Sequence, residues 1–282
     1  MGLAPDTQNL IDQALGEDQA FNDPTTTALI PPDLEGAGVI RSKADGVLAG
    51  VEVAFAVFRR VDSGLRTQAL LDDGSALAPG DSVARVEGSA ASILRGERTA
   101  LNFLQRMSGI ATETSRYVKA VHGCNAKIVD TRKTVPGWRH LDKYAVRAGG
   151  GANHRMNLAD GILIKDNHIA ALRSRGLSLK EAVTQALERA PHTIKVEVEV
   201  TDLDELQEAL DAGGHIIMLD NMSPTDMRRG MEMVSGRALI EASGGVDLET
   251  VRAIAETGVD LISVGGLTHS SRALDMSLDL EF

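Results

Sequence analysis

The pattern of apolar and polar positions changes at about residue 127. From there on, short β-prone runs alternate with segments that have the apolar spacing of helices. The expected strands cover residues 127–130, 161–165, 195–200, 216–220, 238–243 and 261–266. The expected helices between them cover residues 179–189, 203–212, 224–234 and 248–257. Strands that alternate with helices in this way predict parallel βαβ units, arranged as a barrel or as an open, doubly wound sheet.

The residues before 127 have a mixed pattern of helices and strands. Helical spacing is expected at 10–15, 51–61, 89–105 and 111–121, and the turn-forming residues 23–27 interrupt the first helix. Strands are expected at 38–43 and 46–49, paired around Ala44 and Asp45, and again at 67–71 and 82–86. This region therefore reads as mixed α+β, either a domain of its own or an extension of one large α/β domain.

Polar residues and glycines follow each expected strand of the second region, and this favours a barrel. Chemistry in α/β barrels is assembled from several strands at their carboxyl ends. A Rossmann sheet would instead concentrate its signal in one glycine-rich turn after the first strand, and the chain has neither that motif nor a Walker A motif.

The charge of the chain is acidic overall but reverses locally. The formal net charge is −11, yet residues 130–168 hold seven Lys and Arg against four Asp, with three His in addition. A cationic island in an acidic protein predicts a small polyanionic ligand rather than nucleic acid, which needs a wider basic surface. The single cysteine, Cys124, excludes an internal disulfide and fits a reducing compartment, and no apolar run is long enough to span a membrane.

Basic residues at three strand-to-helix connections are candidates for binding this anion. Thr131, Arg132 and Lys133 follow one expected strand, Lys165 ends the next, and His154-Arg155 follows three consecutive glycines. Arginine offers two-pronged contacts to carboxylate or phosphate, and lysine a point charge. Solvated loops, a lysine extending to the rim, or an ion pair of Lys165 with Asp166 are the structural alternatives. The recurrence of basic residues on neighbouring units favours binding.

Acidic residues and glycines complete the candidate site. Glu197 and Glu199 share one face of a strand because side chains alternate, and Asp220 ends the next strand. Such carboxylates suit substrate hydroxyls or a Mg²⁺ ion shared with phosphates, which we prefer for Glu199 and Asp220, whereas ion pairing remains open for Glu197. Two loops resemble a phosphate cradle on the last two strands. They contain Ser243, Gly244, Gly245, Val264, Gly265 and Gly266.

Taken together, these motifs strongly resemble those of the quinolinate phosphoribosyltransferases. The matching segments are GERTALNFLQRMSGIAT, DTRKTVPGWR, KYAVRAGGGANHRMNL, ILIKDNHI, VEVEV, MLDNMSP, EASGGV and SVGGLTHS, and they occur in the order of the family. The resemblance covers most of the chain and is densest from Arg95 to Ser270. Val135 and Trp138 lie within a motif and are read as tolerated variation.

The resemblance implies a reaction and a fold. Quinolinate and phosphoribosyl pyrophosphate would give nicotinate mononucleotide, pyrophosphate and CO₂ in the presence of Mg²⁺. The fold would be an N-terminal α/β sandwich domain (1–112, with the tail 273–282 returning to it) and an incomplete, open α/β barrel of parallel strands (113–272).

The family's site residues can be transferred to matching positions of this chain. Quinolinate would be held by Arg132, His154, Arg155 and Lys165, and the phosphoribosyl part by Lys133 and the glycine loops. Thr131 would also bind substrate. Catalysis would fall to Lys133, Lys165, Glu199 and Asp220, with Glu199 and Asp220 near Mg²⁺. Arg98, which by its local sequence is a solvated helix residue, would reach the active site of the partner in a homodimer.

Two other functions stay open at this point. One is a related barrel transferase, either a nicotinate phosphoribosyltransferase or the paralogue associated with molybdenum transport. The other is a non-catalytic anion-binding protein, which would have no need of the Mg²⁺-type carboxylates. A pocket for two carboxylates favours the quinolinate enzyme, and a cytoplasmic location is expected.

Overall fold

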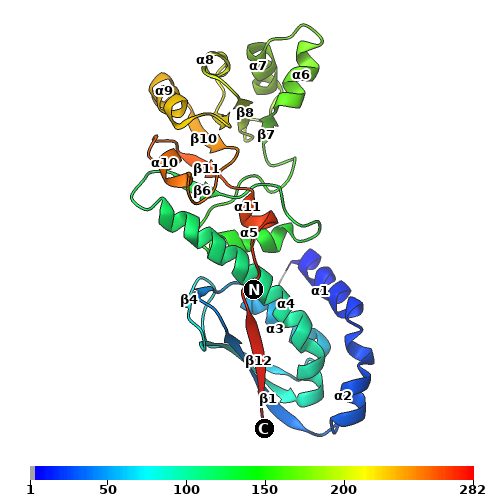
Figure 1. Cartoon of the computed structure of the whole chain (residues 1–282). Helices are drawn as coiled ribbons and strands as arrows, with labels where there is room; N and C mark the ends of the chain where they lie inside the picture. Colours follow the sequence, from blue (N-terminus) through cyan, green and yellow to red (C-terminus); the bar gives the residue numbers. More distant parts are fainter. Residues whose placement is uncertain (1–3) are drawn as a thin grey trace. The chain divides into compact units, whose positions relative to one another are not determined.

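A computed structural model describes residues 4–282 and divides the chain into two compact units. The first unit comprises the residues up to 115 together with 134–150 and 268–282, and the second comprises 116–133 and 151–267. Figure 1 labels their helices and strands. These two units are defined by contacts between residues in space. The domains expected from the sequence, residues 1–112 and 113–272, are meant as folding units, so their boundaries stay a prediction.

The first unit is built on an antiparallel sheet of four strands in the order β12-β1-β5-β3. These strands are β1 (Glu35–Ser42), β3 (Arg66–Ala69), β5 (Ser82–Ser89) and β12 (Met276–Glu281). The last strand of the chain thus pairs with the first, with Val39 opposite Asp279. A second, two-stranded sheet joins β2 (Gly46–Val47) to β4 (Ala76–Leu77). The end of the chain therefore completes the N-terminal part of the fold.

The expected pairing of residues 38–43 with 46–49 is wrong. Strand β1 is already paired on both sides, with β12 and β5, so it has no edge left for β2. Strand β2 pairs instead with β4, and the Val47 N–H also donates to Oγ1 of Thr112 over 2.8 Å. The partner that displaces the local hairpin comes from the other end of the sequence, where no local pattern can reveal it.

The helices of this unit differ from expectation mainly in length. They are α1 (Pro5–Glu17), the 3₁₀ turn η1 (Ala20–Asn22), α2 (Pro24–Leu29), α3 (Val51–Val61), α4 (Ala90–Ala120) and α5 (Arg139–Ala148). The helix expected at 51–61 is confirmed. The two expected at 89–105 and 111–121 are one helix, α4. Gly109 does not break it, because the glycine is there for packing: a Cβ would lie 2.0 Å from the Arg272 carbonyl oxygen.

The turn-forming residues 23–27 start a helix rather than a loop. Asp23 is the N-cap of α2, and its carboxylate accepts the backbone N–H groups of Thr25 and Thr26 at 2.9 and 3.2 Å. Pro24 follows at the first helical position, where its missing N–H costs nothing. Helix α1 ends earlier, at Glu17, so these residues cap the next helix rather than interrupt the first.

The second unit contains the parallel sheet, with strands in the order β6-β11-β10-β9-β8-β7. Its strands are β6 (Lys127–Val129), β7 (Ile162–Ile164), β8 (Val196–Val200), β9 (Ile216–Asp220), β10 (Leu239–Ser243) and β11 (Leu261–Ser263). The helices after them are α6 (Asp166–Arg173), α7 (Leu179–Arg189), α8 (Leu203–Asp211), α9 (Pro224–Val234), α10 (Val251–Ala255) and the short α11 (Gly266–His269). All six expected strands are confirmed.

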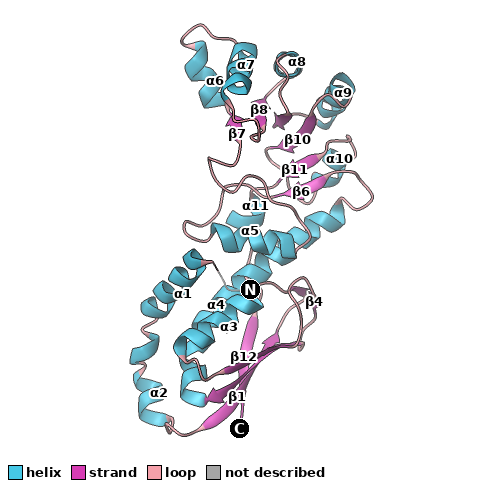
Figure 2. Cartoon of the chain, turned by 180° about the vertical axis from the view of Figure 1, so that it is seen from behind, coloured by secondary structure: helices cyan, strands magenta, loops and turns pink. Residues whose placement is uncertain are grey.

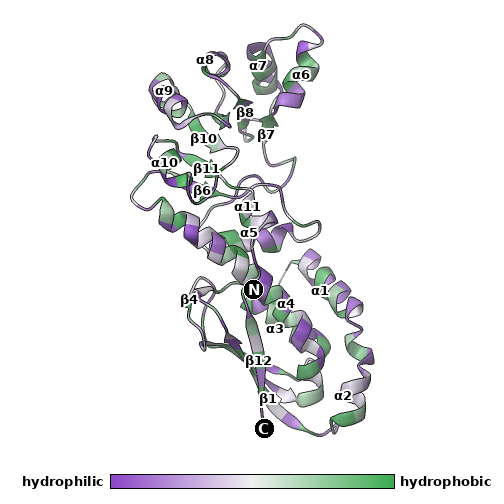
Figure 3. Cartoon of the chain, viewed as in Figure 1, coloured by the Kyte–Doolittle hydropathy of each residue, from purple (hydrophilic) through white to green (hydrophobic). Residues whose placement is uncertain are grey.

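The sheet is an incomplete barrel, as expected. Strands β6 and β7 form its two edges and are not paired with each other in the described residues. Figure 2 shows strands of this sheet, among them β7, β8 and β10, with helices α6 to α10 beside them. In Figure 3, strands β10 and β11 are largely green, and Ile240, Ala242 and Ile262 are fully buried. None of the helices in residues 4–282 has both the length and the apolar composition needed to cross a membrane.

Candidate active site

A pocket of about 590 Å³ opens at the carboxyl ends of the parallel strands. Its size is typical of a site for a small molecule. Alternate residues at three strands line it: Leu163 with Lys165, Met218 with Asp220, and Glu241 with Ser243. The period of two follows from the pleat of the strands, which places these side chains on one face.

Most of the residues predicted from the sequence lie together in this pocket. Thr131, Arg132, Lys133, His154, Arg155, Lys165, Glu199, Asp220, Ser243, Gly244 and Gly245 line it. Val264, Gly265 and Gly266 do not, although Ser263 just before them does. Arg98 is an exposed residue of α4 in the first unit. Its predicted role in a partner's site stays a prediction.

Two arginines present unsatisfied donors within the pocket wall. Nε of Arg132 and Nε of Arg155 are buried and have no hydrogen-bond partner in the described residues. The Arg155 guanidinium donates through Nη1 to the Gly161 carbonyl oxygen at 2.8 Å. Its pKa is lowered from the ordinary value, first by burial and then by the like charge of Arg132. Two neighbouring guanidinium groups with buried, unpartnered Nε donors favour an anionic ligand, which would satisfy both their charge and their donors.

The chain segment that carries His154 and Arg155 is held by a fully buried carboxylate. Asp130 follows β6, and its oxygens accept from the His154 backbone N–H at 2.9 Å and from Nδ2 of Asn153 at 2.6 Å. The glycines before this segment permit a close approach of the backbone and an unusual backbone angle. A Cβ on Gly149 would lie 2.3 Å from the Ala111 carbonyl oxygen, and Gly150 has φ +88°.

Lys165 is exposed at the pocket rather than buried at the strand end. Its Nζ lies 3.1 Å from Oε2 of Glu199, and the exposed fractions of the two side chains are 46% and 11%. The lysine side chain extends to the rim of the pocket, which was one of the structural alternatives for this residue. Its ion-pair partner, however, is Glu199 and not the neighbouring Asp166. Glu199 is therefore already engaged by a cation in this state of the protein.

Asp220 lies at a glycine turn of the neighbouring strand. Its Oδ2 accepts from Nδ2 of Asn221 at 2.8 Å, and the Asn221 backbone N–H donates to the Ser243 carbonyl oxygen at 2.9 Å. Gly244 has φ +87°, and a Cβ there would lie 2.3 Å from Oδ1 of Asn221. Glycine is thus required at 244 both by its backbone angle and by the close side chain of Asn221.

The floor of the pocket holds a buried cluster that sequence reasoning only partly found. Nε2 of His154 lies 3.1 Å from Oε2 of Glu197 and 3.6 Å from Oε2 of Glu241. Glu197 and Glu241 are 5% and 1% exposed. The pKa of the Glu241 carboxyl is raised to about 7, mainly by burial and next by the charge of Glu197. This resolves the role left open for Glu197, which pairs with a histidine.

Glu241, Asn221, Ser263, Leu163 and Met218 line the pocket but were not among the predicted site residues. Met218 is buried, yet one side of it faces the pocket. For Glu241 a signal existed in the sequence. It lies two residues before Ser243 in an otherwise apolar strand, so it shares the face that Ser243 presents to the pocket.

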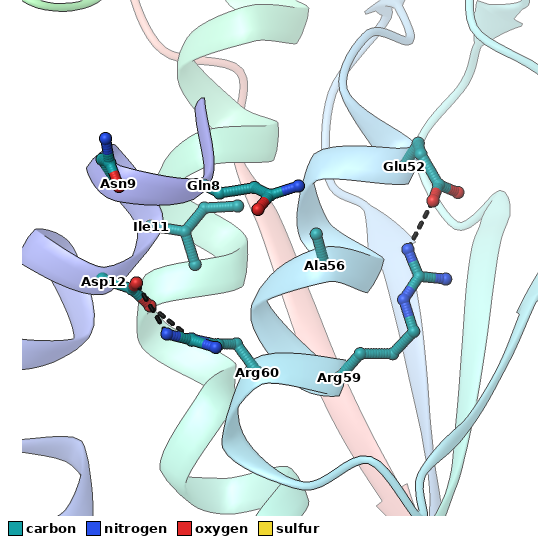
Figure 4. A pocket seen from close by; sticks show the side chains of 8 residues that line it. All are labelled: Gln8, Asn9, Ile11, Asp12, Glu52, Ala56, Arg59 and Arg60. Atoms are coloured by element: carbon teal, nitrogen blue, oxygen red, sulfur yellow. Dashed lines mark hydrogen bonds and ion pairs between the residues drawn. The ribbon is translucent and has the colours of Figure 1, made fainter. Parts of the chain in front are cut away.

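A second cavity, of about 480 Å³, lies between α1 and α3 of the first unit. Figure 4 shows that ion pairs cross its walls, with Arg60 bound by Asp12 and Arg59 by Glu52. These pairs are exposed and neutralise each other's charges. The cavity contains none of the predicted site residues, and its charge does not select a ligand of either sign.

Comparisons with known proteins match nearly the whole chain. The model of the quinolinate phosphoribosyl transferase N-terminal domain matches residues 23–108, and that of the C-terminal domain matches residues 110–279. The nicotinate-nucleotide pyrophosphorylase (carboxylating) of Mycobacterium leprae is 43% identical, over 97% of this chain and 96% of its own. A mitochondrial quinolinate phosphoribosyltransferase (decarboxylating) of Nicotiana tabacum is 42% identical, over 98% of this chain and 82% of its own.

A solved structure extends the likeness to the fold. The crystal structure of NadC from Streptococcus pyogenes has a TM-score of 0.94 and 42% sequence identity, and the match covers 100% of this chain and 99% of that one. The likeness therefore includes both units of the fold described above.

Proposed function

Because this chain belongs to the quinolinate phosphoribosyltransferase family, we propose that it transfers a phosphoribosyl group from phosphoribosyl pyrophosphate to quinolinate. The products are nicotinate mononucleotide, pyrophosphate and CO₂, a step of NAD biosynthesis. The observation that carries the proposal is the composition of one pocket. Arg132, Arg155 and Lys165 bring cations for a dicarboxylate, and Asp220 brings a carboxylate for the sugar side.

The pocket divides into two parts by charge. Quinolinate has two adjacent carboxylates, and the buried donors of Arg132 and Arg155 supply planar contacts that fit them. Lys165 exchanges Glu199 for a substrate carboxylate when quinolinate enters. Lys133 and the turn at Gly244 and Gly245 lie at the same pocket and suit the phosphate groups.

Positioning and electrostatics supply most of the rate enhancement in this proposal. As pyrophosphate departs, positive charge develops on the sugar carbon, and the carboxylates of Asp220 and Glu199 stabilise it. The ring nitrogen of quinolinate attacks that carbon from the cationic side of the pocket. The alkylated ring then carries a positive charge, which draws the electrons of the neighbouring carbon–carboxylate bond and releases CO₂. Neither the phosphoribosyl transfer nor the loss of CO₂ requires a covalent intermediate with the protein.

Mg²⁺ belongs to the proposal as a companion of the phosphoribosyl substrate. Mg²⁺ prefers carboxylate and phosphate oxygens and is commonly held by one or two protein carboxylates with the rest from substrate and water. Asp220 fits this, because its carboxylate lines the pocket and is bound by a neutral amide rather than a cation. Glu199 fits less directly, since Lys165 competes for it. When bound, the ion neutralises the departing pyrophosphate.

A homodimer and a cytoplasmic location complete the proposal. Arg98 is exposed on α4 and is available to a neighbouring subunit, where it would add a further cation to the quinolinate part of the site. The single cysteine is consistent with a reducing compartment.

Product analysis tests the proposal directly. The purified protein is incubated with phosphoribosyl pyrophosphate, Mg²⁺ and one of quinolinate, nicotinate or nicotinamide, and nucleotides are separated by chromatography. We expect nicotinate mononucleotide from quinolinate alone, together with CO₂. Formation of the nucleotide from nicotinate, and none from quinolinate, would reject the assignment in favour of the related barrel transferase.

A further inference from the structure

The proposed reaction needs a proton that its substrates do not bring. When the carboxylate next to the ring nitrogen leaves as CO₂, the bond electrons stay on the ring carbon. The product carries hydrogen at that carbon, so a proton must be delivered there. Without delivery, the carbanion recaptures CO₂ and the step reverses. The pocket wall around the dicarboxylate is cationic, but guanidinium groups hold their protons too tightly to give them up at neutral pH.

From this geometry, and on the basis of the proposed function, we infer that Glu241 is the acid that protonates the ring carbon after CO₂ leaves. Glu241 lines the pocket and is 1% exposed, so it reaches the ligand space without being open to bulk water. Its Oε1 is buried and has no hydrogen-bond partner in the described residues. A buried oxygen without a partner is costly unless it has a function or gains a partner when the ligand binds.

The surroundings of Glu241 keep the proton on it. Glu197 on β8 faces it with a buried negative charge, and two carboxylates in one buried site do not both ionise readily. His154 and Lys165 act in the opposite sense, as does Ser263 on β11, but burial and Glu197 dominate, so the pKa of Glu241 is raised to about 7. A neutral Glu241 also avoids repelling the two carboxylates of quinolinate.

His154 separates the roles of the two acids. Its Nδ1 accepts from the Arg155 backbone N–H at 2.8 Å, which leaves the ring proton on Nε2. That proton is directed at Oε2 of Glu197, 3.1 Å away, and Oε2 of Glu241 lies further off at 3.6 Å. Oε2 of Glu197 thereby has a donor, whereas its Oε1 is, like Oε1 of Glu241, buried without a hydrogen-bond partner in the described residues. The same tautomer argues against a metal ion held by the three side chains, because Nε2 has no lone pair to offer.

The proton transfer balances. The bond between the ring carbon and the carboxylate breaks, its electron pair stays on the carbon beside the positively charged ring nitrogen, and CO₂ leaves. The O–H bond at Oε1 of Glu241 then breaks and a C–H bond forms, leaving nicotinate mononucleotide and a Glu241 carboxylate. As product leaves, Glu241 becomes open to solvent and takes up a proton from the bulk solution, which returns it to the acid form.

Single-turnover kinetics of Glu241→Gln test the inference. Glutamine keeps the size and the neutrality of the acid but has no proton to transfer. We expect quinolinate affinity to be unchanged and pyrophosphate to form at the wild-type rate, whereas CO₂ release slows on the order of a hundredfold, as for loss of a general acid. Pyrophosphate would thus precede CO₂. Equal rates of CO₂ release in variant and wild type would overturn the inference.

The pH profile gives an independent measurement. The protonated form of Glu241 is the active one, so wild-type CO₂ release should be high below pH 7 and fall as pH rises through about 7. Glu241→Gln should lack this fall. Glu197→Gln is the matched control: it removes the charge that helps hold the proton, so the fall should move to lower pH. An unshifted fall in Glu197→Gln would contradict the inference even if Glu241→Gln failed to fold.

Failure of the inference is distinguishable from failure of the proposed function. If the wild-type protein forms no nicotinate mononucleotide from quinolinate, the function itself is wrong. If the wild type forms it and the two variants match the wild type in CO₂ release and pH profile, the function stands and another group, such as pocket water, delivers the proton.

Discussion

The ammonium group of Lys165 and the carboxylate of Glu199 lie 3.1 Å apart across the neighbouring strands β7 and β8. Both residues were predicted to contact substrates, and in this state they contact each other. Substrate binding must therefore break this ion pair, because a carboxylate of quinolinate competes with Glu199 for the lysine. Partly exposed ion pairs contribute little to the free energy of folding, so the exchange of partners costs little free energy.

This pair predicts opposite effects on binding and turnover. In Glu199→Gln, Lys165 no longer has an anionic partner within the protein and is more available to quinolinate. We expect quinolinate affinity, measured by isothermal titration, to be unchanged or tighter, while kcat falls because a carboxylate on the sugar side is lost. A clear loss of quinolinate affinity would show that Glu199 supports this substrate directly.

Arg132→Ala and Arg155→Ala should each weaken quinolinate binding strongly. Removing one partner of a desolvated charge pair costs on the order of 2–5 kcal/mol. Arg173→Ala is a matched control, since Arg173 forms an exposed ion pair with Glu205 on α8, and Arg173 does not line the pocket. Titration of all three variants should separate the two pocket arginines from the control. Unchanged affinity in both pocket variants would remove them from the quinolinate site.

Asp220→Asn should lower kcat far more than quinolinate affinity, because the lost charge acts on the sugar and on the transition state. The amide can still bond to Asn221, so the local turn should persist. Steady-state kinetics at several Mg²⁺ concentrations provide the measurement, and we expect the variant to need more Mg²⁺ for half-maximal rate. Near-normal kcat would exclude Asp220 from catalysis.

Gly244→Ala should weaken binding of phosphoribosyl pyrophosphate through the backbone. The left-handed angle at residue 244 costs an alanine roughly 1–2 kcal/mol, and its Cβ would displace the Asn221 side chain that bonds to Asp220. We expect a higher KM for this substrate with quinolinate affinity retained. Gly213→Ala is the control, because Gly213 has a similar angle of +85° and does not line the pocket. Equal effects of the two substitutions on KM would point to general destabilisation.

Local patterns predicted the elements well where neighbours in sequence determine them. Helices α3, α7 and α9 begin and end at the predicted residues, and each has an apolar face of helical spacing. Prediction failed where a residue distant in sequence determines the structure. Examples are the pairing of β1 with β12, and Gly109, which lies inside a helix because the carbonyl of residue 272 leaves no room for a Cβ. Propensity alone contains no information on such partners.

The residues of the candidate site were also predicted where the local sequence marks them and missed where distant residues give them their role. Charged residues at strand ends were predicted because they interrupt an apolar pattern at a position where barrels place their chemistry. Glu241 was missed because it lies inside a strand, where a single acid reads as a tolerated exception. Its significance depends on Glu197 and His154, which approach it from other parts of the chain. The partner of Lys165 was likewise decided by the register of β7 and β8, which the sequence does not state.

The prediction for Arg98 concerns assembly, and it separates a shared active site from one made by a single chain. Arg98 is exposed on helix α4, in the first unit, whereas the pocket residues belong to the second. If it completes the site of a partner subunit, then Arg98→Ala and Lys165→Ala proteins are each inactive alone. In a mixed dimer one site carries both lesions and the other carries neither. Subunit exchange should therefore restore up to about a quarter of wild-type activity, since random pairing makes half of the dimers mixed and each has one intact site.

Exchange of subunits is verified by native mass spectrometry, and a mixture of Arg98→Ala with Arg132→Ala should recover activity in the same way. Arg132→Ala mixed with Lys165→Ala is the control, because both lesions then affect pocket residues of the same chain and no intact site can form. Absence of recovery despite verified exchange would mean that Arg98 acts within its own chain or not at all.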